Sequence, residues 1–106
     1  MARQVIVRYK VAPEMVARNE ELVRAVYEEL HEADPPGFSY ATLKLDDGVT
    51  FVHVARSEDG AAPLTELAAF QRFLDGIAER CTEQPVTNEW DQIGAFRMFA
   101  ADDDRD

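Results

Sequence analysis

The chain contains one cysteine, Cys81, and this scarcity excludes an internal disulfide. A chain without a disulfide framework is typical of a reducing compartment, so we expect a cytoplasmic protein. Cys81 falls on the apolar stripe of a predicted helix, with no histidine or asparagine close to it in the sequence. These features favour a small buried hydrophobic side chain over a nucleophile.

Basic residues are also scarce, because 11 lysines and arginines stand against 21 aspartates and glutamates, which gives a formal net charge of −10. Phosphate binding requires clustered basic side chains, so we expect no nucleic acid and no anionic membrane surface as a partner. No apolar run approaches the roughly 18 residues that span a bilayer. The first residues, MARQVIVRYK, lack the hydrophobic region of a signal peptide.

Motifs for common cofactors are missing: no GxGxxG, P-loop, CxxC or GxSxG occurs. We therefore expect no nucleotide cofactor, no iron–sulfur cluster and no serine hydrolase site. His31 lies among Glu28, Glu29 and Glu32, but the sequence has neither HExxH nor a second correctly spaced histidine. A solvated helix face is favoured there over a metal site, and we expect no metal ion.

The length of 106 residues allows one domain with a modest core. We expect this domain over residues 1–99 and an acidic, solvated, disordered tail over residues 100–106.

A β-hairpin is predicted for residues 38–56, where two runs rich in β-branched and aromatic residues flank Asp46-Asp47-Gly48. An Asp-Gly turn between alternating strands is the strongest short-range hairpin signal. The other elements are arranged around this hairpin.

Before the hairpin, residues 3–11 alternate as a strand and residues 13–30 form an amphipathic helix. After it, residues 65–81 read as a second helix and residues 86–99 as a last strand, with Gly94 as a bulge or bend. The order β-α-β-β-α-β is the ferredoxin-like split unit. We expect an α+β fold with a four-stranded antiparallel sheet and two helices on one face.

Two residues interrupt the helical patterns. Asn19 breaks the apolar stripe of the first helix, which indicates either a late helix start or a buried hydrogen bond. Gly76 sits inside the second helix at a cost of about 1 kcal/mol relative to alanine. We expect close approach of another backbone at Gly76.

The helices must cover one face of the sheet, and we assign the purely apolar rows to that face. These rows are Val5, Val7 and Tyr9; Ala41, Leu43 and Leu45; Val52 and Val54; and Phe96 and Met98. The opposite face then holds Ile6, Arg8, Tyr40, Thr42, Phe51, His53, Ile93 and Arg97. Such a half-apolar face requires a partner.

The strand motif VIVRYKVAPE, the hairpin DDGVTFVHV and the segment FQRFLDGIAERC resemble antibiotic biosynthesis monooxygenase-like domains over roughly residues 3–99. The resemblance implies a homodimeric α+β barrel in which two four-stranded sheets pack face to face. Some relatives oxidise polyketide-like aromatics without a prosthetic group, and others degrade haem. The haem-degrading branch uses an Asn, a Trp and a His, whereas this chain has Arg8 in the first strand and Trp90 just before the last.

In such a dimer the half-apolar face becomes a cavity for a small apolar or aromatic ligand. His53 is the candidate for acid–base catalysis, and its alternative is a structural histidine bonding across the barrel. Tyr40 is a second catalytic candidate, as a donor of a proton or hydrogen bond, or it packs with its hydroxyl satisfied. Phe51 and Thr42 are expected to line the substrate site.

Arg8 and Arg97 are expected side by side on the first and last strands. They would bind an anionic or enolic oxygen of the substrate, or pair with carboxylates of the partner chain. Trp90 is expected to anchor the dimer interface.

We therefore expect a small-molecule-binding protein that oxygenates an electron-rich aromatic or polyketide-like compound without a cofactor. The alternatives are a non-catalytic ligand-binding or interaction module on the same fold, and an isomerase or dehydratase that uses the same base and oxyanion site without oxygen.

Overall fold

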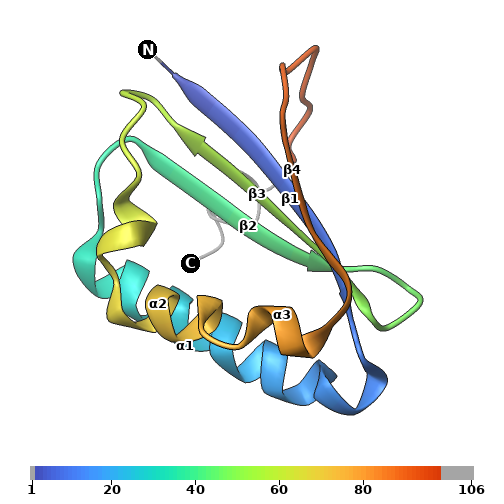
Figure 1. Ribbon diagram of the computed structural model, residues 1–106. Helices are drawn as coiled ribbons and strands as arrows, with labels where there is room; N and C mark the ends of the chain where they lie inside the picture. Colours follow the sequence, from blue (N-terminus) through green and yellow to red (C-terminus); the bar gives the residue numbers. More distant parts are fainter. Residues whose placement is uncertain (1, 99–106) are drawn as a thin grey trace.

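The computed structural model describes residues 2–98, and the predicted tail of residues 100–106 lies outside them. The elements are β1 (Arg3–Val11), a 3-10 turn η1 (Pro13–Met15), α1 (Val16–Ala33), β2 (Phe38–Lys44), β3 (Thr50–Ser57), a 3-10 turn η2 (Pro63–Glu66), α2 (Ala68–Leu74), α3 (Ile77–Arg80) and β4 (Cys81–Glu89). The four strands form one antiparallel sheet in the order β2-β3-β1-β4. Figure 1 shows the helices together on one side of it. The predicted ferredoxin-like α+β fold is confirmed.

Helix α1 forms where the sequence predicted it, after the 3-10 turn that Pro13 opens. It buries Leu22, Val23 and Val26 against the sheet, because apolar residues recur at helical spacing. It ends at Asp34, whose left-handed backbone (φ 46°) directs its N–H to the carbonyl oxygen of Leu30 at 2.7 Å. No helix among the described residues is long and apolar enough to cross a membrane.

The hairpin turn is held by the side chain of Asp47. Its Oδ1 accepts hydrogen bonds from the backbone N–H groups of Val49, at 3.0 Å, and Thr50, at 2.9 Å. A hydrogen bond from the Thr50 hydroxyl, together with these two backbone bonds, lowers the pKa of Asp47 to about 2. Gly48 supplies the positive φ of 78° that the turn requires.

The predicted faces of the two hairpin strands were wrong. Val7 on β1 pairs with His53 on β3, and His53 pairs with Thr42 on β2, so these side chains share one face. That face carries Tyr9 and Phe51, both buried in the core beneath the helices. We call it the covered face.

The aliphatic rows lie on the opposite, open face, where Ile6 pairs with Val54 and Val54 with Ala41. Both rows of the hairpin can be buried, so apolarity alone did not fix its orientation. The aromatic and polar row is inside because its polar atoms find hydrogen-bond partners there.

The predicted second helix is two helices. Gly76 lies between α2 and α3 with φ 80°, in the left-handed region. A Cβ at this position would meet nothing closer than Glu79 Oε1, at 3.6 Å. Backbone conformation, and not the expected close approach of a neighbour, therefore accounts for this glycine. Cys81 begins β4 and is half-buried, so its predicted place on a helix was wrong.

The last strand lies earlier than predicted, at Cys81–Glu89 instead of residues 86–99. Pro85 falls within β4, where the pairing with β1 shifts register. Proline is tolerated there because β4 is an edge strand and the ladder is interrupted. Trp90 then anchors the chain to β1, since its N–H bonds to the carbonyl of Gln4 at 3.2 Å and its Nε1–H to that of Val5 at 2.9 Å.

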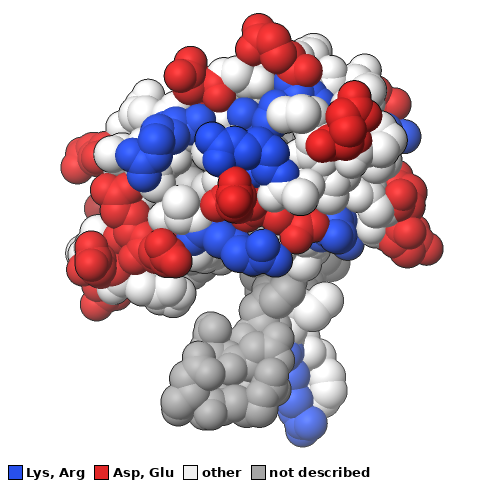
Figure 2. All heavy atoms as spheres, turned by 90° about the horizontal axis from the view of Figure 1, so that it is seen from below, with Lys and Arg blue, Asp and Glu red and all other residues white. Residues whose placement is uncertain are grey.

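Charged side chains of both signs occupy one side of the molecule. Figure 2 shows acidic and basic groups interspersed over the side seen from below. Six ion pairs among the described residues involve exposed or half-exposed groups, including the contact of Arg8 with Glu83 at 3.7 Å. Exposed pairs of this kind contribute at most about 1 kcal/mol each.

Candidate functional site

His53 lies in the interior between the sheet and the helices. Only 6% of the residue is exposed. Its ring stacks against Tyr9, with 5.3 Å between centroids, and against Tyr40, at 5.8 Å. Phe73 of α2 covers it from the helical layer at 5.5 Å. The imidazole is therefore enclosed by aromatic rings from both layers.

Both ring nitrogens of His53 have hydrogen-bond partners. Nε2 lies 2.8 Å from the hydroxyl of Tyr9. Nδ1 lies 2.7 Å from the hydroxyl of Tyr40 and 3.0 Å from that of Thr42. The β1 row and the hairpin rows meet here because the strand register places all four residues on the covered face.

The network continues from Tyr9 into the helices. Asn19 of α1 is fully buried and donates from Nδ2 to the Tyr9 hydroxyl at 2.9 Å. Its Oδ1 accepts from Nε of Arg80 at 3.2 Å. The buried hydrogen bond considered for Asn19 is therefore present, and the late helix start is excluded because α1 already begins at Val16.

Arg80 is a buried cation, 4% exposed. Its other donors bond to the backbone carbonyls of Phe73, at 2.6 Å, and Asp75, at 3.2 Å. Its guanidinium also lies 5.3 Å from the centre of the Phe73 ring. No carboxylate pairs with it among residues 2–98. The charge is therefore held by neutral oxygens and an aromatic face.

Burial sets the protonation states of this network. Desolvation lowers the pKa of His53 to about 4, so the imidazole is neutral at pH 7. Desolvation raises the pKa of Tyr9 and of Tyr40, so both phenols keep their protons. The interior therefore offers neutral hydrogen-bonding groups beside one cation.

A groove between α1 and β2 leads from the surface to this network. It has a volume of about 410 Å³ and is lined by Glu20, Val23, Arg24, Tyr27, Thr42, Lys44 and Phe51. In it the hydroxyl of Tyr27 lies 2.8 Å from Oγ1 of Thr42, which itself contacts His53. We call this hollow the α1–β2 groove.

The rim of the α1–β2 groove is charged. Glu20 of α1 pairs with Lys44 of β2, and with Arg24 one turn further along α1 at 3.1 Å. These cations lower the pKa of Glu20, chiefly through its hydrogen bond to Lys44. Two cations and one carboxylate leave the rim with a net positive charge.

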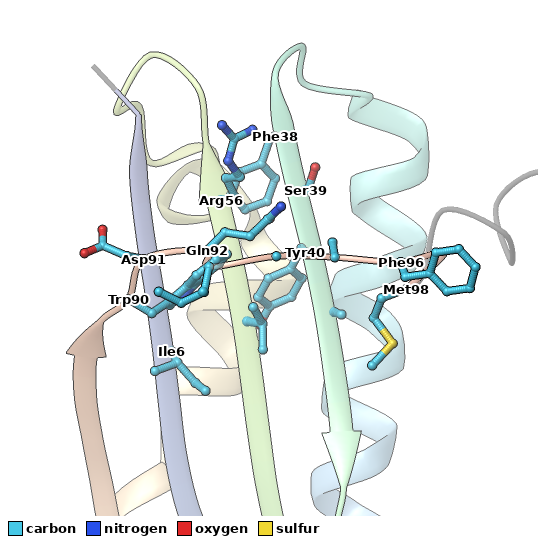
Figure 3. A pocket seen from close by; sticks show the side chains of 15 residues that line it. Ile6, Phe38, Ser39, Tyr40, Arg56, Trp90, Asp91, Gln92, Phe96 and Met98 are labelled. Atoms are coloured by element: carbon cyan, nitrogen blue, oxygen red, sulfur yellow. The ribbon is translucent and has the colours of Figure 1, made fainter.

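A larger hollow, of about 1020 Å³, lies on the open face. Figure 3 shows the chain after Trp90 crossing the sheet, with Ile6 below and Arg56 above its path in this view. Apolar side chains of this crossing segment are strongly exposed: 97% for Ile93 and 80% for Phe96. The segment therefore leaves apolar surface uncovered in the single chain.

The structure brings four of the six predicted site residues together. His53, Tyr40 and Thr42 are hydrogen-bonded neighbours, and Phe51 is 2% exposed beside them, stacked on Tyr9 at 5.6 Å. They lie under the helices and not, as predicted, on the face that would meet a partner.

The two predicted arginines do not join this site or each other. Arg8 is on the open face, paired in the sheet with Val86. Arg97 lies beyond β4 with φ 56° and its guanidinium 4.7 Å from the Phe96 ring centre. The predicted cationic end of a cavity was therefore wrong, because the last strand ends before Arg97.

Sequence reasoning missed Arg80, Tyr9 and Tyr27 as members of the network, and it left a buried hydrogen bond of Asn19 as one of two possibilities. Asn19 gave a signal, since a polar residue within an apolar helical stripe requires a buried partner. Tyr9 was assigned to the covered face, where it is found, and Tyr27 lies within the predicted amphipathic helix, packed against the core. Hydrophobic periodicity does not show whether a tyrosine hydroxyl takes part in a buried network. No group of three potential metal ligands occurs among the described residues.

The element order, the sheet topology and the one-sided helical layer define a ferredoxin-like α+β domain. More particularly, the fold is that of the antibiotic biosynthesis monooxygenase-like domains, and the predicted resemblance is confirmed at the level of fold. No protein-family model and no curated protein matches the sequence.

Several solved structures are similar to this chain in fold. A protein of Nitrosomonas europaea, provisionally described as an antibiotic biosynthesis monooxygenase, matches with a TM-score of 0.72 at 20% identity, over 87% of this chain and 90% of that one. Rv0793 of Mycobacterium tuberculosis matches with a TM-score of 0.69 at 15% identity, over 90% and 98%. A mutant of SnoaB, a cofactor-independent oxygenase of Streptomyces nogalater, matches with a TM-score of 0.65 at 14% identity, over 92% and 98%.

Proposed function

We propose that this protein binds a small aromatic molecule at the α1–β2 groove and oxygenates it without a cofactor. The observation that carries the proposal is the neutral, buried set of hydroxyls around His53 in a fold shared with a cofactor-independent oxygenase. Hydrogen-bond donors held in a low-dielectric interior stabilise a developing oxyanion without reorganisation. An electron-rich phenol or enol fits this chemistry.

The reaction requires only the substrate and dioxygen. Loss of the phenolic or enolic proton leaves an electron-rich anion, which gives electrons to O2. One oxygen atom bonds to the ring carbon and the other leaves as water, so the substrate itself supplies the electrons. Because burial lowers the pKa of His53 to about 4, the imidazole is too weak a base to ionise an ordinary phenol, so a phenol or enol that is itself acidic fits this site.

One observation favours the alternative of a non-catalytic binding module. Every buried side-chain nitrogen and oxygen among the described residues already has a hydrogen-bond partner within the chain. A network satisfied in this way also specifies a unique core. An isomerase or dehydratase would use the same groove without oxygen.

We also propose that the active form is a homodimer joined through the open face. Val86 on β4 is 59% exposed and Leu43 on β2 is 39% exposed at the two edges of that face. The crossing segment adds Ile93, Phe96 and Met98, which are still more exposed. Apolar surface on this scale is typical of an interface, and a second copy of the same face is complementary in character. The lone cysteine supports a cytoplasmic location.

Oxygen uptake with a panel of phenols and anthrones tests the proposed function. We expect uptake with at least one compound, and a matching quinone in the product. Thr42→Val should abolish most of this uptake because it removes a hydroxyl that joins His53 to the groove. The exposed His31→Gln is the matched control and should leave it unchanged. Ligand binding without uptake by any compound would favour the binding module instead.

A further inference from the structure

We infer that Arg80 gives the network a single hydrogen-bond direction that ends in a free donor at the α1–β2 groove, so that the groove selects the ionised oxygen of a phenol or enol. This inference rests on the proposed function of the groove as a small-molecule site. It adds the form of ligand that the site binds and identifies Arg80 and Asn19 as positioning residues.

The direction begins at Arg80, because a guanidinium can only donate. Its Nε–H reaches Oδ1 of Asn19 at 3.2 Å, so the amide oxygen must face Arg80. The amide nitrogen then faces Tyr9 and donates to its hydroxyl oxygen at 2.9 Å. The donor-to-acceptor direction that Arg80 sets therefore continues through the amide of Asn19 to Tyr9.

Tyr9 must send its own proton onward. The residue is 1% exposed, and Nε2 of His53, at 2.8 Å, is the acceptor within reach in the described part of the chain. A buried hydroxyl without an acceptor is costly, so Nε2 must be the bare nitrogen. At neutral pH the imidazole then carries its hydrogen on Nδ1.

With Nδ1 protonated, the hydroxyls of Tyr40 and Thr42 accept from it and cannot donate to it. The proton of the buried Tyr40 is then directed to the hydroxyl oxygen of Thr42, with which it shares a hydrogen bond. The proton of Thr42 is then directed to the hydroxyl oxygen of Tyr27, 2.8 Å away. The proton of Tyr27 has no acceptor among residues 2–98 and emerges in the groove that Tyr27 lines.

A ligand that accepts the last hydrogen bond of this series, from the hydroxyl of Tyr27, must present a hydrogen-bond acceptor. Lys44 and Arg24 at the rim outnumber the single carboxylate of Glu20, so a negative acceptor is favoured over a neutral one. Phe51 and Val23 supply apolar walls for a ring. A phenolate or enolate meets all three conditions: an acceptor oxygen, a negative charge and an apolar body.

The first test measures the tautomer of His53 by the ¹⁵N chemical shifts of its ring at neutral pH. We expect the Nδ1–H form in the wild type. Asn19→Asp reverses the direction, because a carboxylate accepts from both Arg80 and Tyr9 and leaves Nε2 to donate. The variant should show the Nε2–H form, while the exposed His31 stays the same in both spectra. An Nε2–H signal from His53 in the wild type would overturn the inference.

The second test uses 4-nitrophenol, whose absorbance reports its ionisation. The wild type should bind the phenolate and lower the apparent pKa of the probe. Tyr27→Phe removes the terminal donor without touching the buried groups and should weaken phenolate binding about tenfold while His53 keeps its tautomer. Equal affinity of the wild type and Tyr27→Phe would also overturn the inference.

Neither measurement requires turnover. A wild type that binds the phenolate but consumes no oxygen would contradict the proposed oxygenase and leave this inference intact.

Discussion

Asn19 and Arg80 are 61 positions apart in the sequence, yet their side chains meet at 3.2 Å inside the molecule. Each is nearly inaccessible to water, at 0% and 4% exposure. The amide therefore supplies a buried guanidinium with an acceptor and a buried phenol with a donor.

Removing this amide should be costly. Asn19→Ala strands a donor of Arg80 and opens a cavity, so we expect a loss of about 2 kcal/mol or more in the free energy of unfolding. Glu28→Ala, at an exposed position of α1, should change it by less than about 0.5 kcal/mol. Urea denaturation of the two variants measures the difference. Similar losses from both would contradict the importance of the buried amide.

Stability should fall as the pH is lowered from 6.5 towards 4. In this window His53 is protonated in the unfolded state but stays neutral in the folded state, because burial lowers the pKa of the folded imidazole to about 4. The free energy of unfolding should decrease by about 3 kcal/mol across the window. The carboxyl groups with lowered pKa, such as Glu20 and Asp47, begin to contribute below about pH 5.

Thermal or urea unfolding between pH 5 and 6.5 isolates this contribution. The His53→Gln variant should be less dependent on pH there than the wild type. An equally steep dependence in the variant would show that another group is responsible.

The backbone at Gly76 should resist substitution. Its φ of 80° is unfavourable for any residue with a Cβ, so Gly76→Ala should destabilise the protein by roughly 1–2 kcal/mol. Gly94 is the matched control, since a Cβ there would meet nothing within 4 Å. Gly94→Ala should be close to neutral in the same thermal melts. A rise in melting temperature for Gly76→Ala would refute the conformational explanation.

A charge in the middle of the open face should dissociate the proposed homodimer. Val54 lies on the central strand β3, opposite Ile6 and Ala41, so Val54→Glu would place a carboxylate within the interface. Leu74→Glu, at a 43% exposed position of α2 in the helical layer, is the control. Sedimentation at micromolar concentration should show a dimer for the wild type and the control, and a monomer for Val54→Glu. A monomeric wild type would contradict the proposal.

Local sequence signals predicted the elements well. The Asp47-Gly48 turn fixed the hairpin, because its hydrogen bonds join residues only two or three positions apart. The start of β4 was missed because Pro85 reads as a strand breaker, whereas an edge strand with a register shift accommodates it.

Local sequence patterns could not predict which face of the hairpin the helices cover or which side chains meet at the site. A shift of one residue exchanges the two faces of a strand, and the hairpin carries buriable side chains on both. What decides between them is the set of hydrogen bonds from His53 to Tyr9 and from Tyr9 to Asn19. These contacts join distant parts of the sequence, and periodicity has no information about them.

The pairing of β1 with β4 has a consequence for how the protein folds during synthesis. The hairpin can close as soon as Ser57 has left the ribosome. The pairing of Val5 with Glu89 forms only after Glu89 has been made. Contacts between such distant residues form slowly, and chains fold from the N-terminus as they emerge. Arg80, the last residue of α3, emerges just before that strand and completes the buried hydrogen bonds with Asn19. A nascent chain therefore leaves the pocket around His53 open until Phe73 and Arg80 have emerged.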